Sequence, residues 1–307
     1  MISSVAHVTL MLPADILAQS IPSPGRGVWH IGPIPIRAYA LLIICGIVLA
    51  TWLTYRRYER RGGPVEHLDT VVCVAVIAGI LGGRLYHVIT DYQLYFGEGK
   101  NPVKALYIWE GGLGIWGAVA LGALGAWLAL KHQGLRLAPF ADALAPGLIF
   151  AQAIGRWGNY FNQELYGRPT TLPWGLRIDD AHLVGDFASG TLFHPTFLYE
   201  SLWCVLGGFL LLWLDHRYDV RGGRLFAIYA MIYTAGRVWI ENLRIDAAHH
   251  VLGLRLNVWT ALVVFLGAWL LYTYLTRRAH NDPHASDIYL PGHGSVANDA
   301  SSKSVQA

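Results

Sequence analysis

The chain has 307 residues, of which 54% are hydrophobic and 14% are charged. Its mean hydropathy of +0.38 is too high for a soluble globular protein, so the composition predicts a protein with several membrane-spanning segments. The net charge of +3 is small and gives no reason to expect binding to nucleic acid.

Seven apolar runs are each long enough to cross about 30 Å of hydrocarbon as a helix. They lie at residues 36–55, 70–88, 113–130, 140–157, 197–214, 225–243 and 258–275. The sequence therefore predicts an all-α polytopic membrane protein with seven transmembrane helices. Between the fourth and fifth runs, residues 159–194 are expected to form a small head region outside the membrane, with short strands around "LPWGLRI".

Basic residues are distributed unevenly between the loops on the two sides of the membrane. The loops after the first, third, fifth and seventh runs carry the larger share of Lys and Arg, among them Arg136 and Arg278. Because short cytoplasmic loops retain basic residues, this bias predicts an N-terminus outside the cell and a C-terminus in the cytoplasm.

The chain thus divides into three parts. Residues 1–35 are expected to be an irregular extracytoplasmic lead-in, residues 36–278 the seven-helix transmembrane domain, and residues 279–307 a disordered cytoplasmic tail without apolar periodicity. The histidines of that tail are not expected to bind metal, and the sequence indicates no cofactor. The three cysteines all lie in apolar runs, which suggests no disulfide framework.

Charged residues inside the predicted helices are the strongest functional signal. A charge at mid-bilayer costs from about 3 to more than 10 kcal/mol, so each such residue is a functional candidate. Arg84, Arg156, Glu200, Arg237 and Glu241 all fall in the outer half of the membrane or at its outer boundary in the predicted orientation. Their clustering on one side suggests one shared site.

Arginines from the second, fourth and sixth helices are expected to converge there. Arg237, Glu241 and Arg244 are spaced by four and three residues, so they share one helical face. A structural ion pair is an alternative explanation for Glu241. Because guanidinium groups present paired donors to phosphate oxygens, a set containing Arg84, Arg156 and Arg237 predicts a phosphate site, with a phospholipid head group as its occupant.

The segment "GRWGNYFNQELYG", residues 155–167, brings amides and a carboxylate next to Arg156. Two glycines beside Arg156 are expected to let the helix end, so that Asn159, Asn162 and Glu164 can bind hydroxyl groups. Hydroxyls together with phosphate suggest a glycerol phosphate head. The alternative is an interfacial helix cap with a polar loop, which explains the glycines and one asparagine but not the whole set.

This segment and several others resemble the bacterial prolipoprotein diacylglyceryl transferases. The signature pattern Gly-Arg-x-Gly-Asn-Phe-x-Asn-x-Glu-x-x-Gly is matched from Gly155 to Gly167, with Tyr160 in place of Phe. Similar segments in the family's order are "IRAYALLI", "GGRLYHVI", "WEGGLGIWG", "HPTFLYE" and "GRVWIENLR". The resemblance extends from about residue 28 to residue 278.

The resemblance implies transfer of the diacylglyceryl group of phosphatidylglycerol to the lipobox cysteine of a prolipoprotein signal peptide, in the bacterial inner membrane. It implies that Arg156, Arg237 and Glu241 are catalytic. It further implies that phosphatidylglycerol is bound by Arg156, Asn159, Glu164, Tyr39, Arg84 and Arg244. For Tyr39, an ordinary interfacial tyrosine anchor is an equal alternative.

One position departs from the family pattern. Many members carry a histidine in the third-helix motif, proposed as the base for the thiol, where this chain has Trp116. The base is then one of His87, His194, Glu164 and Glu241, or the arginines alone lower the thiol pKa. For His194, capping of the fifth helix is the favoured alternative to a role as base.

A transporter of lipids or anionic solutes is the rival interpretation, because it too would use intramembrane arginines. Such a protein is expected to have broken helices in both halves of the chain. The sequence shows one good break, after Arg156. Its few pairs of similar short segments lie at unequal depths in the predicted helices, so they do not indicate an internal repeat.

Overall fold

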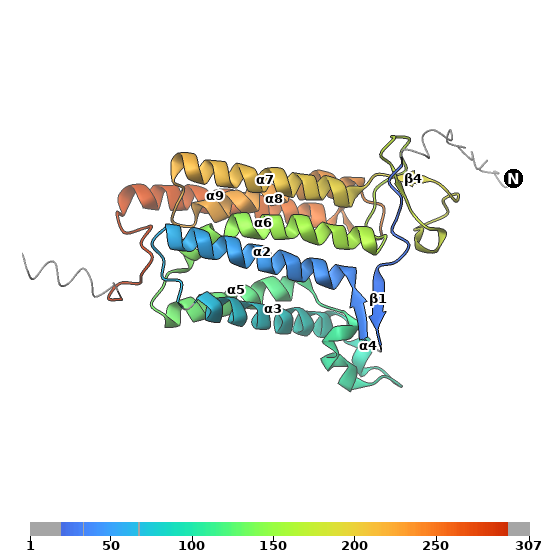
Figure 1. Ribbon diagram of the computed structural model, residues 1–307, viewed down its shortest axis with the longest axis horizontal. Coiled ribbons are helices and arrows are strands. Elements are labelled where there is room, and N and C mark those ends of the chain that lie inside the picture. The colour runs from blue at the N-terminus through green and yellow to red at the C-terminus, as the bar shows by residue number, and fades with distance from the viewer. Residues whose placement is uncertain (1–19, 33, 67, 294–307) are drawn as a thin grey trace, which may run out of the picture. The chain divides into compact units, whose positions relative to one another are not determined.

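The computed structural model describes residues 20–32, 34–66 and 68–293 (Figure 1). In this part of the chain, six helices are long and apolar enough to cross a membrane. They are α2 (Ala38–Arg60), α3 (Leu68–Thr90), α5 (Ile115–His132), α6 (Leu137–Phe161), α7 (Thr196–Tyr218) and α9 (Leu256–Asn281). The prediction of a mostly helical protein with several membrane spans is confirmed.

The remaining predicted span corresponds to α8 (Arg224–Leu243), a helix of 20 residues. It is not among the six, because Arg237 and Glu241 lie within its apolar stretch. Six of the seven predicted spans are therefore found by length and composition, and the exception is the helix that carries the predicted ion pair.

The helices differ in how much of their apolar surface the protein covers. Half of the most apolar window of α6 is buried, against about a fifth for α2, α3, α5 and α9. Side chains such as Ile77, Leu81 and Val263 are largely exposed. Apolar surface on this scale is typical of helices that face lipid, whereas protein covers a larger share of α6.

The described residues form two compact units. The first comprises residues 20–52, 144–220 and 224–274, and the second comprises residues 53–143, 221–223 and 275–293. Helices α2, α6 and α9 each contribute residues to both units.

The core of the first unit lies between α6, α7 and α8. Ile149, Cys204, Leu211 and Leu225 are almost wholly buried in it. Helix α7 approaches α6 closely at Gly208, where an added Cβ would lie 2.5 Å from the ring of Phe150. Small residues in α7 therefore allow close packing, as is typical of membrane helices.

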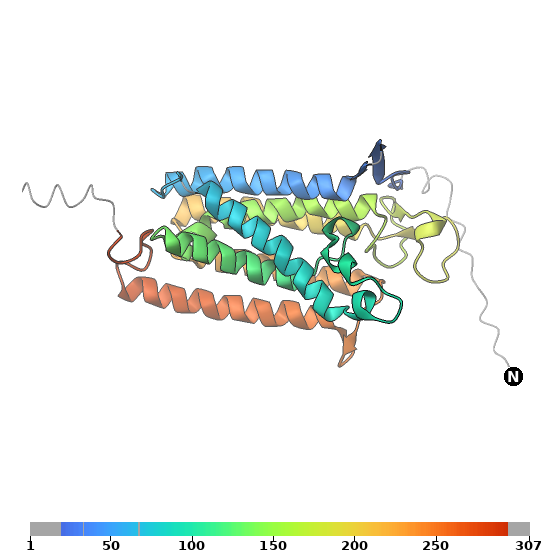
Figure 2. The same cartoon turned by 90° about the horizontal axis from the view of Figure 1, so that it is seen from below.

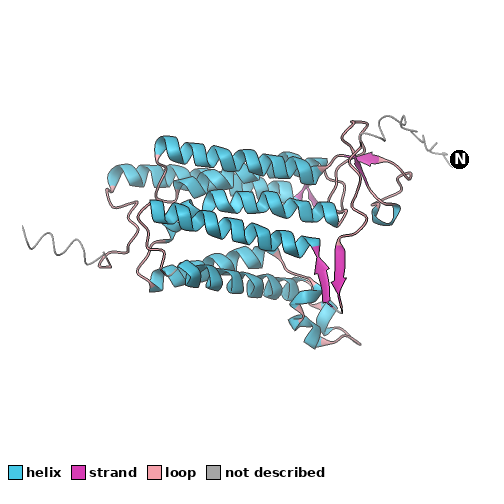
Figure 3. Ribbon diagram, in the orientation of Figure 1, coloured by secondary structure: helices cyan, strands magenta, loops and turns pink. Residues whose placement is uncertain are grey.

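A β-hairpin precedes α2 in the first unit (Figure 3). Strand β1 (Val28–Ile31) pairs with β2 (Ile34–Arg37), and the turn uses Gly32 at a φ of +60°. The lead-in was expected to be irregular, and this part of it is corrected to a hairpin that continues directly into α2. Residues 1–19 of the predicted lead-in lie outside the described residues.

The segment between α6 and α7 folds around an apolar cluster of its own. Strand β3 (Leu176–Arg177) pairs with β4 (Leu192–Phe193), and the short helix η3 (Asp180–His182) lies between them in the chain. Tyr166 and Ile178 are buried against Phe193 in this cluster. The short strand expected at "LPWGLRI" is confirmed. A further hairpin, β5 (His250–Val251) with β6 (Leu254–Arg255), precedes α9.

In the second unit, α3 and α5 lie side by side in both views (Figures 1 and 2). A Cβ added at Gly82 would lie 2.3 Å from the Gly117 carbonyl oxygen, so the two backbones nearly touch. Small residues in both helices therefore allow close packing here. The connection contains α4 (Gln93–Phe96), η1 (Pro102–Leu106) and η2 (Ile108–Glu110).

The segment after α9 contradicts the prediction of disorder from residue 279. Helix α9 continues to Asn281, and Tyr289 then bridges Leu135 in the loop between α5 and α6. The backbone N–H of Arg136 donates to Ile288 at 2.8 Å. Backbone pairing, which hydropathy does not show, orders residues 279–293, and residues 294–307 lie outside the described residues.

Candidate active site

Arg156 lies near the end of α6, where three helices of the first unit meet. Its Nη2 atom is 2.9 Å from Glu200 of α7 and donates to the hydroxyl of Tyr233 of α8 at 3.1 Å. Its Nη1 atom donates weakly to Asn159, at 3.5 Å. The guanidinium thus has partners on its own helix and on both neighbours.

Glu200 connects the two arginines that the sequence predicts to be catalytic. One carboxylate oxygen is 2.9 Å from Arg156, and the other is 3.1 Å from Nη1 of Arg237. The Glu200 side chain is 5% exposed, so both ion pairs are shielded from solvent. The structure therefore brings Arg156 and Arg237 together, with a carboxylate between them.

Glu241 is fully buried and lies at the centre of a second group of arginines. Its carboxylate accepts from Arg237 Nη2 at 2.6 Å, Arg244 Nη1 at 3.3 Å and Arg255 Nε at 3.0 Å. Asn257 donates to the same carboxylate at 2.9 Å. The helical spacing of Arg237, Glu241 and Arg244 predicted a shared face, and the three side chains do meet there.

Asp246 extends this network beyond the end of α8. It pairs with Nε of Arg244 at 2.7 Å and with Nη2 of Arg255 at 2.9 Å. Burial raises the pKa of Asp246, but the hydrogen bond from Arg244 and the charges of Arg244 and Arg255 outweigh it and hold the pKa below its usual value.

Two members of this network, Asp246 and Arg255, were not predicted. Arg255 ends strand β6, directly before α9, and Asp246 lies in the loop after α8. Only their contact with Glu241 and Arg244 identifies them, and residues so far apart in sequence show no common spacing. The network alternates four arginines with three carboxylates, which leaves one net positive charge.

The network leaves donors available on the two predicted catalytic arginines. Within the described residues, the Nε–H groups of Arg156 and Arg237 have no hydrogen-bond acceptor. These groups, with the net positive charge, can receive an anion such as phosphate.

The polar residues after Arg156 form a second, connected group. Glu164 accepts from the side-chain amides of Asn159 at 2.8 Å and Asn162 at 3.1 Å. Asn159 is buried, while Glu164 is exposed. Since Asn159 also contacts Arg156, the group continues from the arginine to the surface.

Helix α6 does not end at the glycines beside Arg156, as the sequence suggested, but continues to Phe161. Gly158 instead allows a close approach of Tyr39 from α2, because an added Cβ would lie 2.2 Å from the tyrosine ring. Tyr39 is thereby placed against the segment that carries Arg156 and Asn159.

Arg84 lies in the second unit, and its guanidinium binds backbone oxygens. Nε donates to Ala105 at 2.8 Å, Nη2 to Lys104 at 2.6 Å, and Nη1 to Gly111 at 2.6 Å and Gly112 at 3.1 Å. The side chain is nearly buried and holds the connection between α3 and α5. A role of Arg84 in phosphate binding stays a prediction.

The two candidate histidines have different partners. His87 of α3 pairs with Asp91 at 3.0 Å and packs its ring against Tyr95. His194 precedes α7, and its Nδ1 lies 3.1 Å from the hydroxyl of Tyr199. Burial and the charge of Arg168 lower the pKa of His194, so its imidazole is neutral at pH 7.

The expected helix cap by His194 is not found. Helix α7 begins at Thr196 after Pro195, and no side chain caps its first turn. The imidazole bonds to Tyr199 instead of to a backbone N–H group. At the family's histidine position, Trp116 lies in the first turn of α5 and is half exposed.

In the described ranges, no group of three or more His, Cys, Asp or Glu side chains could hold a metal ion.

Comparison with known proteins identifies the family. Residues 26–274 match the family described as prolipoprotein diacylglyceryl transferase. A phosphatidylglycerol--prolipoprotein diacylglyceryl transferase of Cutibacterium acnes is 55% identical over 268 residues, which cover 87% of this chain and 90% of that protein. The protein of the same name from Streptomyces avermitilis is 54% identical over 89% of this chain and 78% of that protein. The protein of that name numbered 1 from Streptomyces coelicolor is 52% identical over 92% of this chain and 80% of that protein. The chain therefore belongs to the prolipoprotein diacylglyceryl transferase family.

Proposed function

We propose that the protein transfers the diacylglyceryl group of phosphatidylglycerol to the lipobox cysteine of a prolipoprotein, the first step of lipoprotein maturation. The cysteine sulfur forms a bond to the glyceryl carbon, while the bond from that carbon to the phosphate oxygen breaks. Glycerol phosphate leaves with the bonding electrons, and the thiol proton passes to a base. The observation that carries the proposal is the joined pair Arg156 and Arg237 within a chain of this family.

The two arginines hold the phosphate and stabilise its departing charge. The phosphodiester of the lipid is already ionised, and the glycerol phosphate that leaves gains a further negative charge, so it needs cations around it more than a proton donor. The Nε–H groups of Arg156 and Arg237 are available for this purpose within the described residues. Glu200 and Glu241 fix the orientation of the guanidinium groups before lipid binds, which reduces the cost of ordering them.

Asn159, Glu164 and Tyr39 bind the glycerol hydroxyls and a phosphate oxygen. The amide and carboxylate are already joined by a 2.8 Å hydrogen bond that a hydroxyl can replace or share. Tyr39 is pressed against Gly158, close in sequence to both. Arg244 pairs with both Glu241 and Asp246, so we expect it to hold Glu241 in position.

The thiol base is not a single essential histidine. His87 and His194 each bond to a neighbouring side chain, and Trp116 occupies the family's usual histidine position. The net positive charge of the arginine network instead favours the thiolate by lowering the pKa of the thiol. We therefore expect His87→Ala and His194→Ala each to keep diacylglyceryl transfer, measured with purified folded protein. Complete loss in a folded variant would identify that histidine as the base.

We infer that the site lies at the outer face of the membrane. We infer that α8 is the seventh span, because its charged residues pair with Glu200 and Arg255 rather than facing lipid. The basic loops then place the N-terminus outside and the C-terminus in the cytoplasm. Residues 159–194, with their own apolar cluster, form the extracytoplasmic head region.

A transport function is not favoured. Relatives across most of the chain are named as transferases. A transporter would need a second broken helix to form its central site, and α6 continues unbroken past Arg156.

The test combines purified protein, phosphatidylglycerol and a lipobox peptide. The peptide is expected to gain the mass of one diacylglyceryl group, with release of one glycerol phosphate. A peptide with Ser in place of the lipobox Cys is the control and should gain nothing. Unchanged peptide mass with folded wild-type protein, together with lipid or solute flux in vesicles, would favour the transporter instead.

A further inference from the structure

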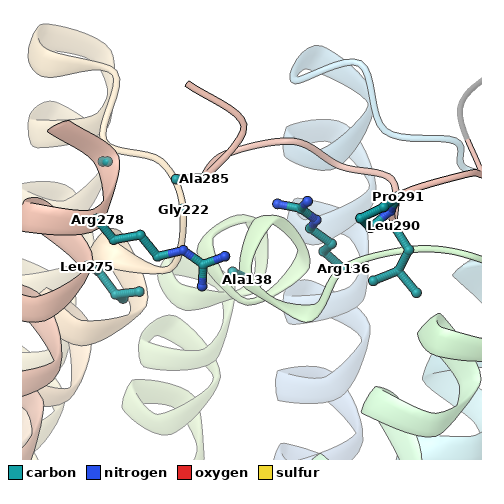
Figure 4. A pocket seen from close by; sticks show the side chains of 9 residues that line it. Arg136, Ala138, Gly222, Leu275, Arg278, Ala285, Leu290 and Pro291 are labelled. Atoms are coloured by element: carbon teal, nitrogen blue, oxygen red, sulfur yellow. The ribbon is translucent and has the colours of Figure 1, made fainter. Parts of the chain in front are cut away.

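A cavity of about 360 Å³ lies in the second unit, and no residue of the arginine network lines it (Figure 4). Its walls come from three parts of the chain. Arg136 and Ala138 come from the start of α6 and the residue before it, Leu275 and Arg278 from the end of α9, and Leu290 from the segment after α9. Sites of this volume are large enough for a small anionic group.

Two arginines point into the cavity from opposite sides (Figure 4). Nη1 of Arg136 donates to the His284 carbonyl at 2.6 Å, and Nε of Arg278 lies 3.8 Å from Asp282. The other guanidinium N–H groups of both side chains have no acceptor within the described residues. Two cations with unused donors thus face one half-open cavity.

The charges around this space favour an anion. Asp282 is the one carboxylate paired with either arginine in the described part, and the pair is loose at 3.8 Å. The nearby Asp287 is instead bonded to His284 at 2.9 Å. Ala138, Leu275 and Leu290 form the apolar part of the cavity wall.

Backbone contacts keep the walls in place. The N–H of Leu290 donates to Gly134 at 2.7 Å, and the N–H of Arg136 donates to Ile288 at 2.8 Å. Gly222 has a φ of +72° and lies so close to Ser286 that an added Cβ would be 3.0 Å from its hydroxyl. The described segments that line the cavity are therefore held in place by the fold.

We propose that this cavity binds a phosphate group through Arg136 and Arg278, at a site separate from the proposed catalytic one. Paired guanidinium groups match phosphate oxygens, and the apolar wall fits the carbon atoms attached to the phosphate. Either a soluble phosphate or an anionic phospholipid head group supplies this chemistry. In the proposed orientation both arginines lie at cytoplasmic helix ends, the depth of the inner-leaflet head groups.

A bound phosphate would link the start of α6 to the end of α9 through Arg136 and Arg278. It would thereby stabilise the segment 282–293, which closes the cavity. Slower backbone hydrogen exchange in that segment is the direct consequence, and it can be measured apart from catalysis.

The experiment measures hydrogen exchange of residues 282–293 in the full-length protein. Nanodiscs of phosphatidylglycerol are compared with nanodiscs of phosphatidylcholine. In detergent, inorganic phosphate is compared with chloride at equal ionic strength. The variants are Arg278→Gln and Arg136→Gln, and Arg277→Gln is the matched control, because Arg277 is the neighbouring arginine outside the cavity.

We expect phosphatidylglycerol to slow exchange in this segment about tenfold, the effect of one or two charged hydrogen bonds. Arg278→Gln should remove this difference while keeping transfer activity, and Arg277→Gln should keep it. Protection by inorganic phosphate in detergent would identify a soluble anion as the source, whereas protection by the lipid alone would identify the head group.

Equal exchange in both nanodiscs with no effect of phosphate would overturn the proposal, as would unchanged protection in Arg278→Gln. Failure of the proposed catalytic function can be distinguished from failure of this proposal. An Arg156→Lys protein without transfer activity should still show the lipid-dependent protection of residues 282–293.

Discussion

Glu200 is the shared partner of the two predicted catalytic arginines. Its carboxylate pairs with both Arg156 and Arg237 and so holds them near one another. An incoming phosphate must compete with this carboxylate, and the guanidinium groups need little reordering when it does. Removing a buried partner of this kind leaves uncompensated charge, which commonly costs about 3–5 kcal/mol.

Arg156→Lys tests whether the paired donors of this side chain matter beyond its charge. Lysine keeps the positive charge near Glu200 but loses the planar fork of N–H groups. We expect kcat/KM for phosphatidylglycerol to fall by about 10²–10³, the usual effect of losing one donor to a developing anion. The measurement is the mass-gain assay with purified variant.

Arg60→Lys is the control for Arg156→Lys, since Arg60 is exposed in the last turn of α2. It should retain wild-type kcat/KM. Near-normal activity of Arg156→Lys would mean that the site needs only a point charge, and the phosphate-clamp interpretation would be withdrawn.

The lowered pKa of His194 makes the stability of the fold depend on pH. The folded pKa of this histidine is lowered from 6.5, so the folded protein favours the neutral imidazole. The associated stabilisation is fully present above pH 6.5 and is lost as the pH falls through the folded pKa. We expect His194→Asn to reduce the drop in Tm between pH 7.5 and pH 5.

His182→Asn serves as the comparison for His194→Asn, because His182 is exposed. It should keep the wild-type drop in Tm. If both variants behave like wild type, the neutral His194 does not contribute to the acid sensitivity of the fold.

At the scale of elements, α2 and α6 meet through a glycine. Tyr39 fits against Gly158, and α6 is also close to α2 at Gly147, where an added Cβ would lie 2.8 Å from the Ala50 carbonyl oxygen. Backbone approach of this kind gives membrane helices dispersion contacts in place of a hydrophobic driving force. The position of Tyr39 therefore depends on the absence of a side chain on its neighbour.

Gly158→Ala and Gly155→Ala form a matched pair in α6. An added Cβ at Gly158 would lie 2.2 Å from the Tyr39 ring, whereas at Gly155 the nearest atom, on Ile43, is 3.9 Å away. We expect Gly158→Ala to lower both Tm and transfer activity, because a methyl group forces the ring aside. Gly155→Ala should leave both nearly unchanged, and equal effects of the two variants would contradict the packing argument.

At the scale of the whole molecule, the proposed orientation puts the arginine network at the outer face of the membrane. A maleimide that does not cross membranes can test this placement in intact cells. Ser189, in the proposed head region, is exposed, and so is His216 in the last turn of α7.

We expect a Ser189→Cys protein to be labelled in intact cells and a His216→Cys protein to be labelled only after lysis. The wild-type protein, whose cysteines lie inside helices, is the control for background labelling. Labelling of His216→Cys in intact cells would reverse the orientation and place the arginine network on the cytoplasmic side.

The sequence by itself determined the helical class of the protein and most of the residues that meet in the arginine network. Hydropathy identifies spans because hydrocarbon tolerates only long apolar helices, and the spacing of Arg237, Glu241 and Arg244 is local and survives folding. The polar segment after Arg156 could be recognised for the same reason. The end of α6 was placed too early, because close contact with Tyr39, and not a helix stop, accounts for Gly158.

Only the tertiary structure decided which distant groups pair. Glu200 lies between Arg156 and Arg237, and Arg255 binds Glu241, because separate segments cross at those points. The order of residues 279–293 depends likewise on pairing with the loop before α6. Contacts between remote segments follow from packing geometry, which produces no periodic pattern in the sequence. Local spacing and hydropathy do produce such patterns, so they can be recognised from the sequence alone.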